Sequence, residues 1–150
     1  MEYYSITPMK VIQEKNDRVI LRFEKGERFP DVFEQWARKR AMGGAFFYGI
    51  GGATRIRSGY YQLSKKTYIF KEFTGDHLEI LHIAGNVAML GDHLKIHTHL
   101  TFANEHFQAF GGHLDWLEVG GTLELKVEIG DPLTRKEDRE IGLALLEITT

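Results

Sequence analysis

Residues 122–129 read TLELKVEI, and this stretch decides the fold class. Apolar side chains stand at alternate positions, Leu123, Leu125, Val127 and Ile129, with polar or charged residues between them. Successive side chains of a β-strand point to opposite faces, so this pattern predicts a strand with one buried and one solvated face. We therefore expect a protein built mainly on antiparallel sheet.

The rest of the chain extends this prediction to a whole domain. Apolar or alternating runs predict further strands at 19–24, 45–50, 59–63, 67–73, 77–90, 94–102, 114–119 and 143–148. One helix is expected at 31–41, DVFEQWARKRA, with Asp31 as N-cap and a buried stripe formed by Phe33, Trp36, Ala37 and Ala41. The sequence thus predicts a single α+β domain over residues 1–150, with a strongly curved, barrel-like antiparallel sheet and one main helix.

Composition limits the functional classes. A formal net charge of −2 argues against a protein coated by nucleic acid, because binding to phosphate backbones needs a strongly positive face. The chain has no cysteine, which excludes disulfides and thiolate metal sites. The N-terminal residues MEYYSITPMK lack the apolar core of a signal peptide and no run approaches a membrane span, so a cytoplasmic protein is expected.

Three histidines form a candidate metal site. His97 and His99, in KIHTHL, share one face of the predicted strand 94–102, so their imidazoles stand side by side. A third ligand is expected at His113, where Gly111 and Gly112 allow a sharp turn and a close approach. Three neutral nitrogens with an open fourth position are typical of catalytic zinc. The alternative is that the H-x-H pair only decorates a solvated strand face.

Other polar residues give weaker signals. Glu79 and Glu124 are candidate general acids or bases, and Arg55, Arg57 and Arg135 are candidate anion-binding residues. For each of them the alternative is an ordinary exposed charge.

Two further patterns are interpreted as structural. His82 lies inside the apolar run 79–90 and is expected to be a hydrogen-bonded core residue. The glycines of YGIGGATRIRSGYY, residues 48–61, precede a predicted strand instead of a helix. A dinucleotide-binding fingerprint needs the helix, so no organic cofactor is expected.

Several blocks of sequence, in order, resemble the plants-and-prokaryotes-conserved (PPC) domain family. They are GIGGATRIRSGYY, HLEILHIAGNVAML, IHTHLTF, GGHL, TLELKVEI and DPLTRKEDREIGLALLEI, which together span most of the chain. The resemblance implies an α+β fold with a curved antiparallel sheet and assembly as a homotrimer. It also implies a metal bound by histidines matching His97, His99 and His113, and a fold relationship with acetolactate decarboxylase, a zinc enzyme.

Plant members of the family join this domain to AT-hooks, short basic segments that enter the minor groove of DNA. The present sequence has no R-G-R-P core and no basic tail, so direct DNA binding is not expected of it. The domain resembles the oligomerisation and partner-binding half of those proteins.

Two functional hypotheses follow. The first is a homotrimeric, metal-binding interaction module with a regulatory role, acting on a protein or nucleic-acid partner. The second is a zinc-dependent enzyme, a decarboxylase or a hydrolase, acting on a small anionic substrate. An enzyme needs a cleft that holds a carboxylate and an arginine near the ion. An interaction module leaves the ion exposed or surrounded by apolar side chains.

Overall fold

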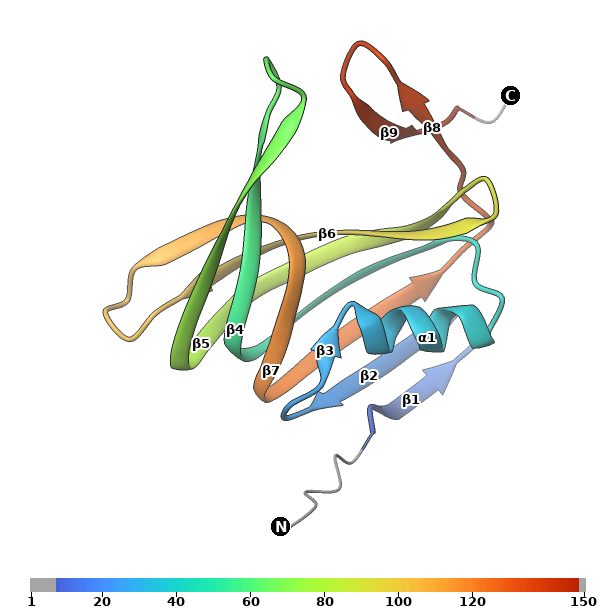
Figure 1. Ribbon diagram of the computed structural model, residues 1–150. Coiled ribbons are helices and arrows are strands. Elements are labelled where there is room, and N and C mark those ends of the chain that lie inside the picture. Colours follow the sequence, from blue (N-terminus) through green and yellow to red (C-terminus); the bar gives the residue numbers. More distant parts are fainter. Residues whose placement is uncertain (1–7, 149–150) are drawn as a thin grey trace, which may run out of the picture.

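The computed structural model describes residues 8–148 (Figure 1). Residues 1–7, which make up most of the N-terminal stretch considered above, lie outside the described part. The elements are β1 (Lys10–Lys15), β2 (Arg18–Glu24), β3 (Arg28–Phe29), α1 (Asp31–Lys39), β4 (Ala45–Gln62), β5 (Thr67–Leu90), β6 (His93–Ala103), β7 (Ala109–Ile129), β8 (Arg135–Asp138) and β9 (Leu143–Leu146). Within residues 8–148, no helix is long and apolar enough to cross a membrane.

A seven-stranded antiparallel sheet forms the body of the protein. Its order is β1-β2-β7-β4-β5-β6, with β3 also on β7, and β6 returns to pair with the start of β7. The long strands β4, β5 and β7 bend strongly, and the β8–β9 hairpin stands apart near the tip of the β4–β5 hairpin (Figure 1). The prediction of a single α+β domain with a strongly curved antiparallel sheet is confirmed, although the sheet is not a closed barrel.

Three pairs of predicted strands are each one long strand. Residues 45–50 and 59–62 belong to β4, which ends one residue before the predicted end at 63. Residues 67–73 and 77–90 belong to β5, and residues 114–119 and 122–129 belong to β7. The expected breaks contain glycines, which bend these strands without ending them. A side chain on Gly49 or Gly51 would overlap the backbone of β7, so glycine is needed there for close approach and not for a turn.

The helix differs from its prediction at both ends. Pro30 is the N-cap, without a side-chain hydrogen bond, while Asp31 is the first helical residue and pairs with Arg28 at 3.3 Å. At the other end α1 stops two residues earlier than predicted. Ala41 has a φ of +50° and is exposed, so it does not belong to the buried stripe. Phe33 is fully buried, as expected.

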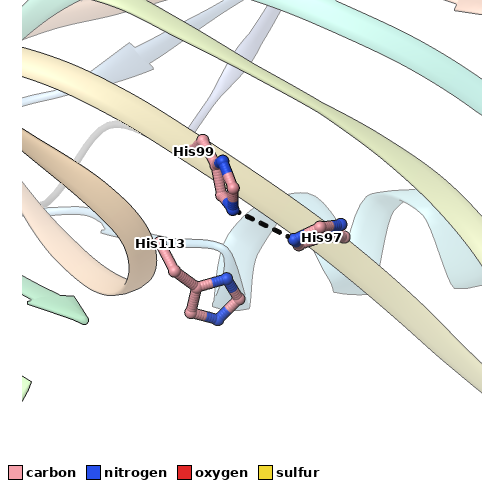
Figure 2. A group of neighbouring side chains, drawn as sticks. All are labelled: His97, His99 and His113. Carbon is pink, nitrogen blue, oxygen red and sulfur yellow. Dashed lines mark hydrogen bonds between the residues drawn. The ribbon is translucent and has the colours of Figure 1, made fainter. Parts of the chain in front are cut away.

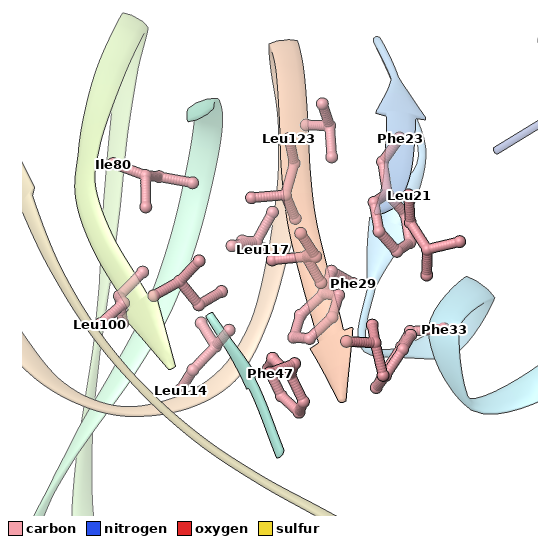
Figure 3. Close-up of a cluster of buried hydrophobic side chains, with 14 of the residues drawn as sticks. Leu21, Phe23, Phe29, Phe33, Phe47, Ile80, Leu100, Leu114, Leu117 and Leu123 are labelled. Atoms are coloured by element: carbon pink, nitrogen blue, oxygen red, sulfur yellow. The ribbon is translucent and has the colours of Figure 1, made fainter. Parts of the chain in front are cut away.

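An aromatic cluster joins the helix to the sheet (Figure 3). The ring of Phe33 lies 5.0 Å from that of Phe47 on β4 and 5.6 Å from that of Phe29 on β3, between centroids. The apolar positions of 122–129 face the same interior, and Leu123 and Leu125 are at most 1% exposed. Because one face of each strand is buried in this core, the opposite face of the sheet remains exposed. The three histidines lie on that opposite face.

Candidate metal centre

The three histidines lie on the side of the sheet opposite the core. On β6, Leu100 and Phe102 are buried, while His97 and His99 project from the other face, as the alternation predicts. His113 on β7 is the direct cross-strand neighbour of His99. The pairing of β6 with β7 therefore places the rings of His99 and His113 opposite each other. His97 lies two residues before His99 on the same strand, so its ring is on the same face.

His113 is reached by a different route from the predicted one. The stretch Gly111–Gly112 is not a turn, because β7 runs continuously through it and pairs His113 with Gly59 of β4. A side chain at Gly112 would lie 2.6 Å from the carbonyl oxygen of Gly59 and 2.8 Å from the hydroxyl of Ser58. The prediction of a turn at Gly111–Gly112 is therefore wrong. The glycine is needed here because β7 and β4 approach each other closely.

The imidazole rings converge on one point (Figure 2). Their centroids are 4.8 Å apart for His97 and His99, 5.3 Å for His97 and His113, and 5.7 Å for His99 and His113. The Nε2 atoms of His97 and His99 are 3.2 Å apart, and one nitrogen from each ring fits within 4.8 Å of the others. Nitrogens on a tetrahedral zinc ion lie about 3.3 Å apart, so the separations between these nitrogens would have to shorten by at most about 1.5 Å.

The surroundings keep two of these rings neutral. The pKa of His97 is lowered to about 4, mainly by burial and further by His99, His113 and Arg135. The pKa of His113 is also lowered, by burial and by His99, against an opposing effect of Asp115. Neutral imidazole is the form that binds metals. Among the residues that the structure describes, none forms a hydrogen bond with the buried Nδ1 atom of His113, and a metal ion would satisfy this nitrogen.

A cavity of about 360 Å³ opens beside His97 and His113, and Arg135 of β8 lines it. The guanidinium donates from Nη1 to the carbonyl oxygen of Ala144 and from Nη2 to the side-chain oxygen of Asn86, each at 2.7 Å. Asn86 is the cross-strand neighbour of His97. The cation is therefore held next to the histidine group by neutral acceptors.

A second hollow, of about 530 Å³, borders the group on its other side. It is lined by His97 and His99 together with Phe46, Tyr48 and His82. His82 is exposed, so its interpretation as a core residue is wrong. The register of β5 shifts immediately before it, which turns this position outward in spite of the apolar sequence around it.

The other charged candidates lie elsewhere. Glu79 and Glu124 line a separate cavity of about 420 Å³ that contains none of the three clustered histidines. Glu79 approaches a different imidazole, with its Oε1 3.4 Å from Nε2 of His77. These carboxylates are therefore not placed to act at the histidine group.

Two of the three arginine candidates already have carboxylate partners. Arg55 lies 3.3 Å from Glu72, and Arg57 lies 2.5 Å from Asp115, measured from nitrogen to oxygen. Of the predicted anion-binding residues, Arg135 is the one that the fold brings to the histidines.

Sequence reasoning missed three residues around this cavity. The ring of Tyr68 lies 4.7 Å from that of His113, and burial raises the pKa of its hydroxyl. Asn86 anchors the arginine, and Glu137 lines the same cavity. The R-x-E spacing of Arg135 and Glu137 was an available signal, because alternate residues share a face once 135–138 is recognised as a strand.

Fold and site together define a curved-sheet α+β domain with a three-histidine group beside a cavity. Residues 12–129 match the model of the Plants and Prokaryotes Conserved domain, abbreviated PCC or PPC. The chain therefore belongs to this family. No curated protein sequence matches it significantly.

Solved structures with similar folds carry several descriptions. A candidate DNA-binding protein from Ralstonia eutropha JMP134 is 27% identical with a TM-score of 0.84, covering 91% of this chain and 95% of that one. A metal-containing protein from Archaeoglobus fulgidus is 28% identical, with a TM-score of 0.81 and coverages of 93% and 99%. A PPC protein from Pyrococcus horikoshii is 26% identical, with a TM-score of 0.81 and coverages of 96% and 97%.

A more distant likeness concerns the fold alone. Acetolactate decarboxylase from Bacillus subtilis strain 168 is 13% identical with a TM-score of 0.52, covering 84% of this chain and 58% of the enzyme. The predicted fold relationship with this enzyme is confirmed, and it carries no activity to the present chain by itself.

Proposed function

We propose that this protein is a homotrimeric PPC-domain protein that holds one divalent ion, zinc, at His97, His99 and His113, and serves as a regulatory binding module. The observation that carries the proposal is the convergence of the three rings, with two Nε2 atoms 3.2 Å apart. The description of the Archaeoglobus relative as metal-containing supports it.

The donor set favours zinc among divalent ions. Imidazole nitrogens suit zinc, whereas magnesium and calcium prefer oxygen ligands. The lowered pKa values of His97 and His113 also reduce competition from protons at neutral pH.

Metal analysis of untagged protein tests the proposal. We expect about one zinc ion per chain, lost in His97→Ala and in His113→Ala because two imidazoles hold zinc far more weakly than three. His106→Ala is the matched control, since this exposed histidine lies outside the group. Full zinc content in both ligand variants would refute the assignment.

An exposed apolar stripe supports assembly into a homotrimer. Phe46, Tyr48 and Ile50 alternate along β4 and are 55%, 47% and 57% exposed, and Leu81 on β5 is 51% exposed. Apolar side chains gathered on a surface in this way mark interfaces. Native mass spectrometry should give a mass near three chains, and the change Tyr48→Asp should shift the population toward monomer. A monomeric wild-type protein would contradict this part of the proposal.

We do not extend DNA binding to this chain. The link to DNA is the description of structural neighbours such as the Ralstonia protein, and a net charge of −2 provides little attraction for a phosphate backbone. Protein and nucleic-acid partners would be distinguished by pull-down of each class with the zinc-loaded protein.

A second candidate function is a zinc-dependent decarboxylase or hydrolase acting on a small anionic substrate. The cavity shared by His97, His113, Arg135 and Glu137 favours it, because it places a cation and a carboxylate beside the histidines. Bound zinc would polarise a carbonyl or activate a water molecule. Arg135 would hold the substrate anion and Glu137 would move a proton.

Turnover decides between the two functions. Zinc-loaded protein would be incubated with acetolactate, the substrate named by the distant fold relative, and with simple esters of short carboxylic acids. Release of carbon dioxide or acid that disappears in Glu137→Gln would establish the enzyme. If zinc-loaded protein turns over none of these compounds, the result would favour the binding module over the enzyme.

A further inference from the structure

We propose that the cavity beside His97 and His113 binds a small aliphatic carboxylate, with its carboxylate group on Arg135 and its other end directed toward the three histidines. The second half of this statement rests on the proposed metal site. The arginine contact does not depend on metal. The inference therefore names a ligand class for the cavity, whichever of the two functions it serves.

Within residues 8–148, the charge of Arg135 is not balanced by an ion pair. Its two side-chain hydrogen bonds go to a carbonyl and to an amide, and its Nε atom is buried with no partner in the described part of the chain. Among residues 8–148, no carboxylate forms an ion pair with it. A partly buried cation without a counter-ion loses hydration energy that a bound anion would restore.

The remaining hydrogen-bond capacity of Arg135 suits a carboxylate. A guanidinium has five N–H donors, and Ala144 and Asn86 take two of them. Burial lowers the pKa of Arg135, which is the effect expected of a cation that lacks a compensating charge. Arginine pairs with carboxylates through short, charge-assisted bonds that lysine does not reproduce.

The walls of the cavity determine the rest of the ligand. Its apolar walls are formed by Leu90, Ile96, Leu143, Leu145 and the ring of Tyr68, and the charged residues Lys95 and Glu137 also line it. Its volume of about 360 Å³ is at the small end of ligand pockets. A short hydrocarbon chain would cover these apolar walls, whereas inorganic phosphate would leave them facing water.

The hairpin that carries Arg135 is fixed in place by the main sheet. The Tyr61 hydroxyl donates to the carbonyl oxygen of Ile141 at 2.7 Å, and Nζ of Lys66 donates to that of Arg139 at 2.6 Å. Both bonds join the tip of the β4–β5 hairpin to the turn between β8 and β9. The arginine is thus held in position before any ligand arrives, which lowers the entropy cost of binding.

Binding of butyrate, compared with 1-butanol and inorganic phosphate, tests the inference. Saturation-transfer NMR titrations would use zinc-loaded protein and protein stripped with EDTA. We expect saturable butyrate binding that is at least about tenfold tighter than binding of 1-butanol, because a charge-assisted hydrogen bond is lost with the alcohol. Arg135→Gln should weaken butyrate by a similar factor. Arg139→Gln, an exposed arginine of the same hairpin, is the matched control and should leave the affinity unchanged.

The outcomes separate this inference from the metal proposal. Butyrate binding that depends on Arg135 in stripped protein supports the arginine anchor even when no zinc binds. Equal binding of butyrate and 1-butanol, or of butyrate by wild type and Arg135→Gln, overturns the inference even when zinc binds fully. Phosphate that competes as tightly as butyrate overturns the ligand class. Circular dichroism would show whether Arg135→Gln is folded. If it is not, the inference is tested instead with Arg135→Lys and with the wild-type titrations of butyrate, 1-butanol and phosphate.

Discussion

The substitution Gly112→Ala tests how the fold places the third histidine. Gly112 precedes His113 and has a φ of +157°, which L side chains rarely adopt. An added Cβ would lie 2.6 Å from the carbonyl oxygen of Gly59 and 2.8 Å from the Ser58 hydroxyl. The hydroxyl can rotate, but Gly59 is paired on both sides, with Phe70 of β5 and His113 of β7, so its carbonyl cannot retreat.

The cost has two parts. Forcing a methyl group into packed backbone costs about 1–3 kcal/mol, and the unfavourable backbone conformation adds about 1–3 kcal/mol. The free energy of unfolding should therefore fall by about 2–6 kcal/mol, a large share of the roughly 5–15 kcal/mol that a domain has. With a urea dependence of about 2 kcal/mol per molar, the unfolding midpoint drops by about 1–3 M.

Urea unfolding of metal-free protein measures this effect, followed by circular dichroism. Gly130→Ala is the control, because no atom of residues 8–148 lies within 4 Å of a Cβ at that position. Zinc affinity is the second readout, since a retreat of β7 from β4 changes the position of His113 within the three-histidine group. A Gly112→Ala midpoint equal to that of Gly130→Ala would show that the close approach does not hold the strands as described.

Three further predictions follow from other parts of the molecule. In metal-free protein the lowered pKa of His97 means that the unfolded chain takes up a proton first, so the free energy of unfolding should decrease as the pH falls from about 6.5 to about 4. The loss is at most about 3 kcal/mol before solvent screening reduces it, and urea titrations of His97→Leu should show a flatter pH dependence. Tyr61→Phe removes the bond to Ile141, worth about 1 kcal/mol, and should speed hydrogen exchange in residues 135–146 while β2 is unaffected. Phe47→Ala, at a position 2% exposed, should cost about 3–5 kcal/mol and lower the melting temperature by roughly 10 °C, whereas Tyr60→Ala, 72% exposed, should change it little.

The faces of the strands could be predicted because burial follows a period of two. In β6 the inward set and the outward histidines were assigned correctly from alternation alone. The lengths of β4, β5 and β7 could not be predicted. A glycine that ends a strand and a glycine that lets two strands approach closely look the same in sequence. Gly49 and Gly51 are of the second kind, and only the backbone of β7 opposite them reveals it.

The residues that surround the histidine group were harder to predict than the three histidines themselves. The H-x-H pair is local, so it could be recognised within one strand, and His113 could be added only as a guess at a distant partner. Choosing Arg135 over Arg55 and Arg57 required knowledge of the register between β5 and β6. That register sets Asn86 opposite His97, and Asn86 in turn holds the guanidinium. Contacts of this kind join residues 49 positions apart and leave no periodic signal.

The residues of the site come from two separate parts of the chain. The three histidines fall inside residues 12–129, the part that matches the family model, whereas Arg135 and Glu137 lie beyond it on β8. The histidines are built into the main sheet, where moving one would disturb the pairing of β4, β6 and β7. The hairpin is a separate two-stranded sheet, attached by the segment after β7, by the bonds from Tyr61 and Lys66, and by the bond from Arg135 to Asn86. Side chains of the hairpin other than Arg135 can therefore change without disturbing the strand pairing that holds the three histidines together.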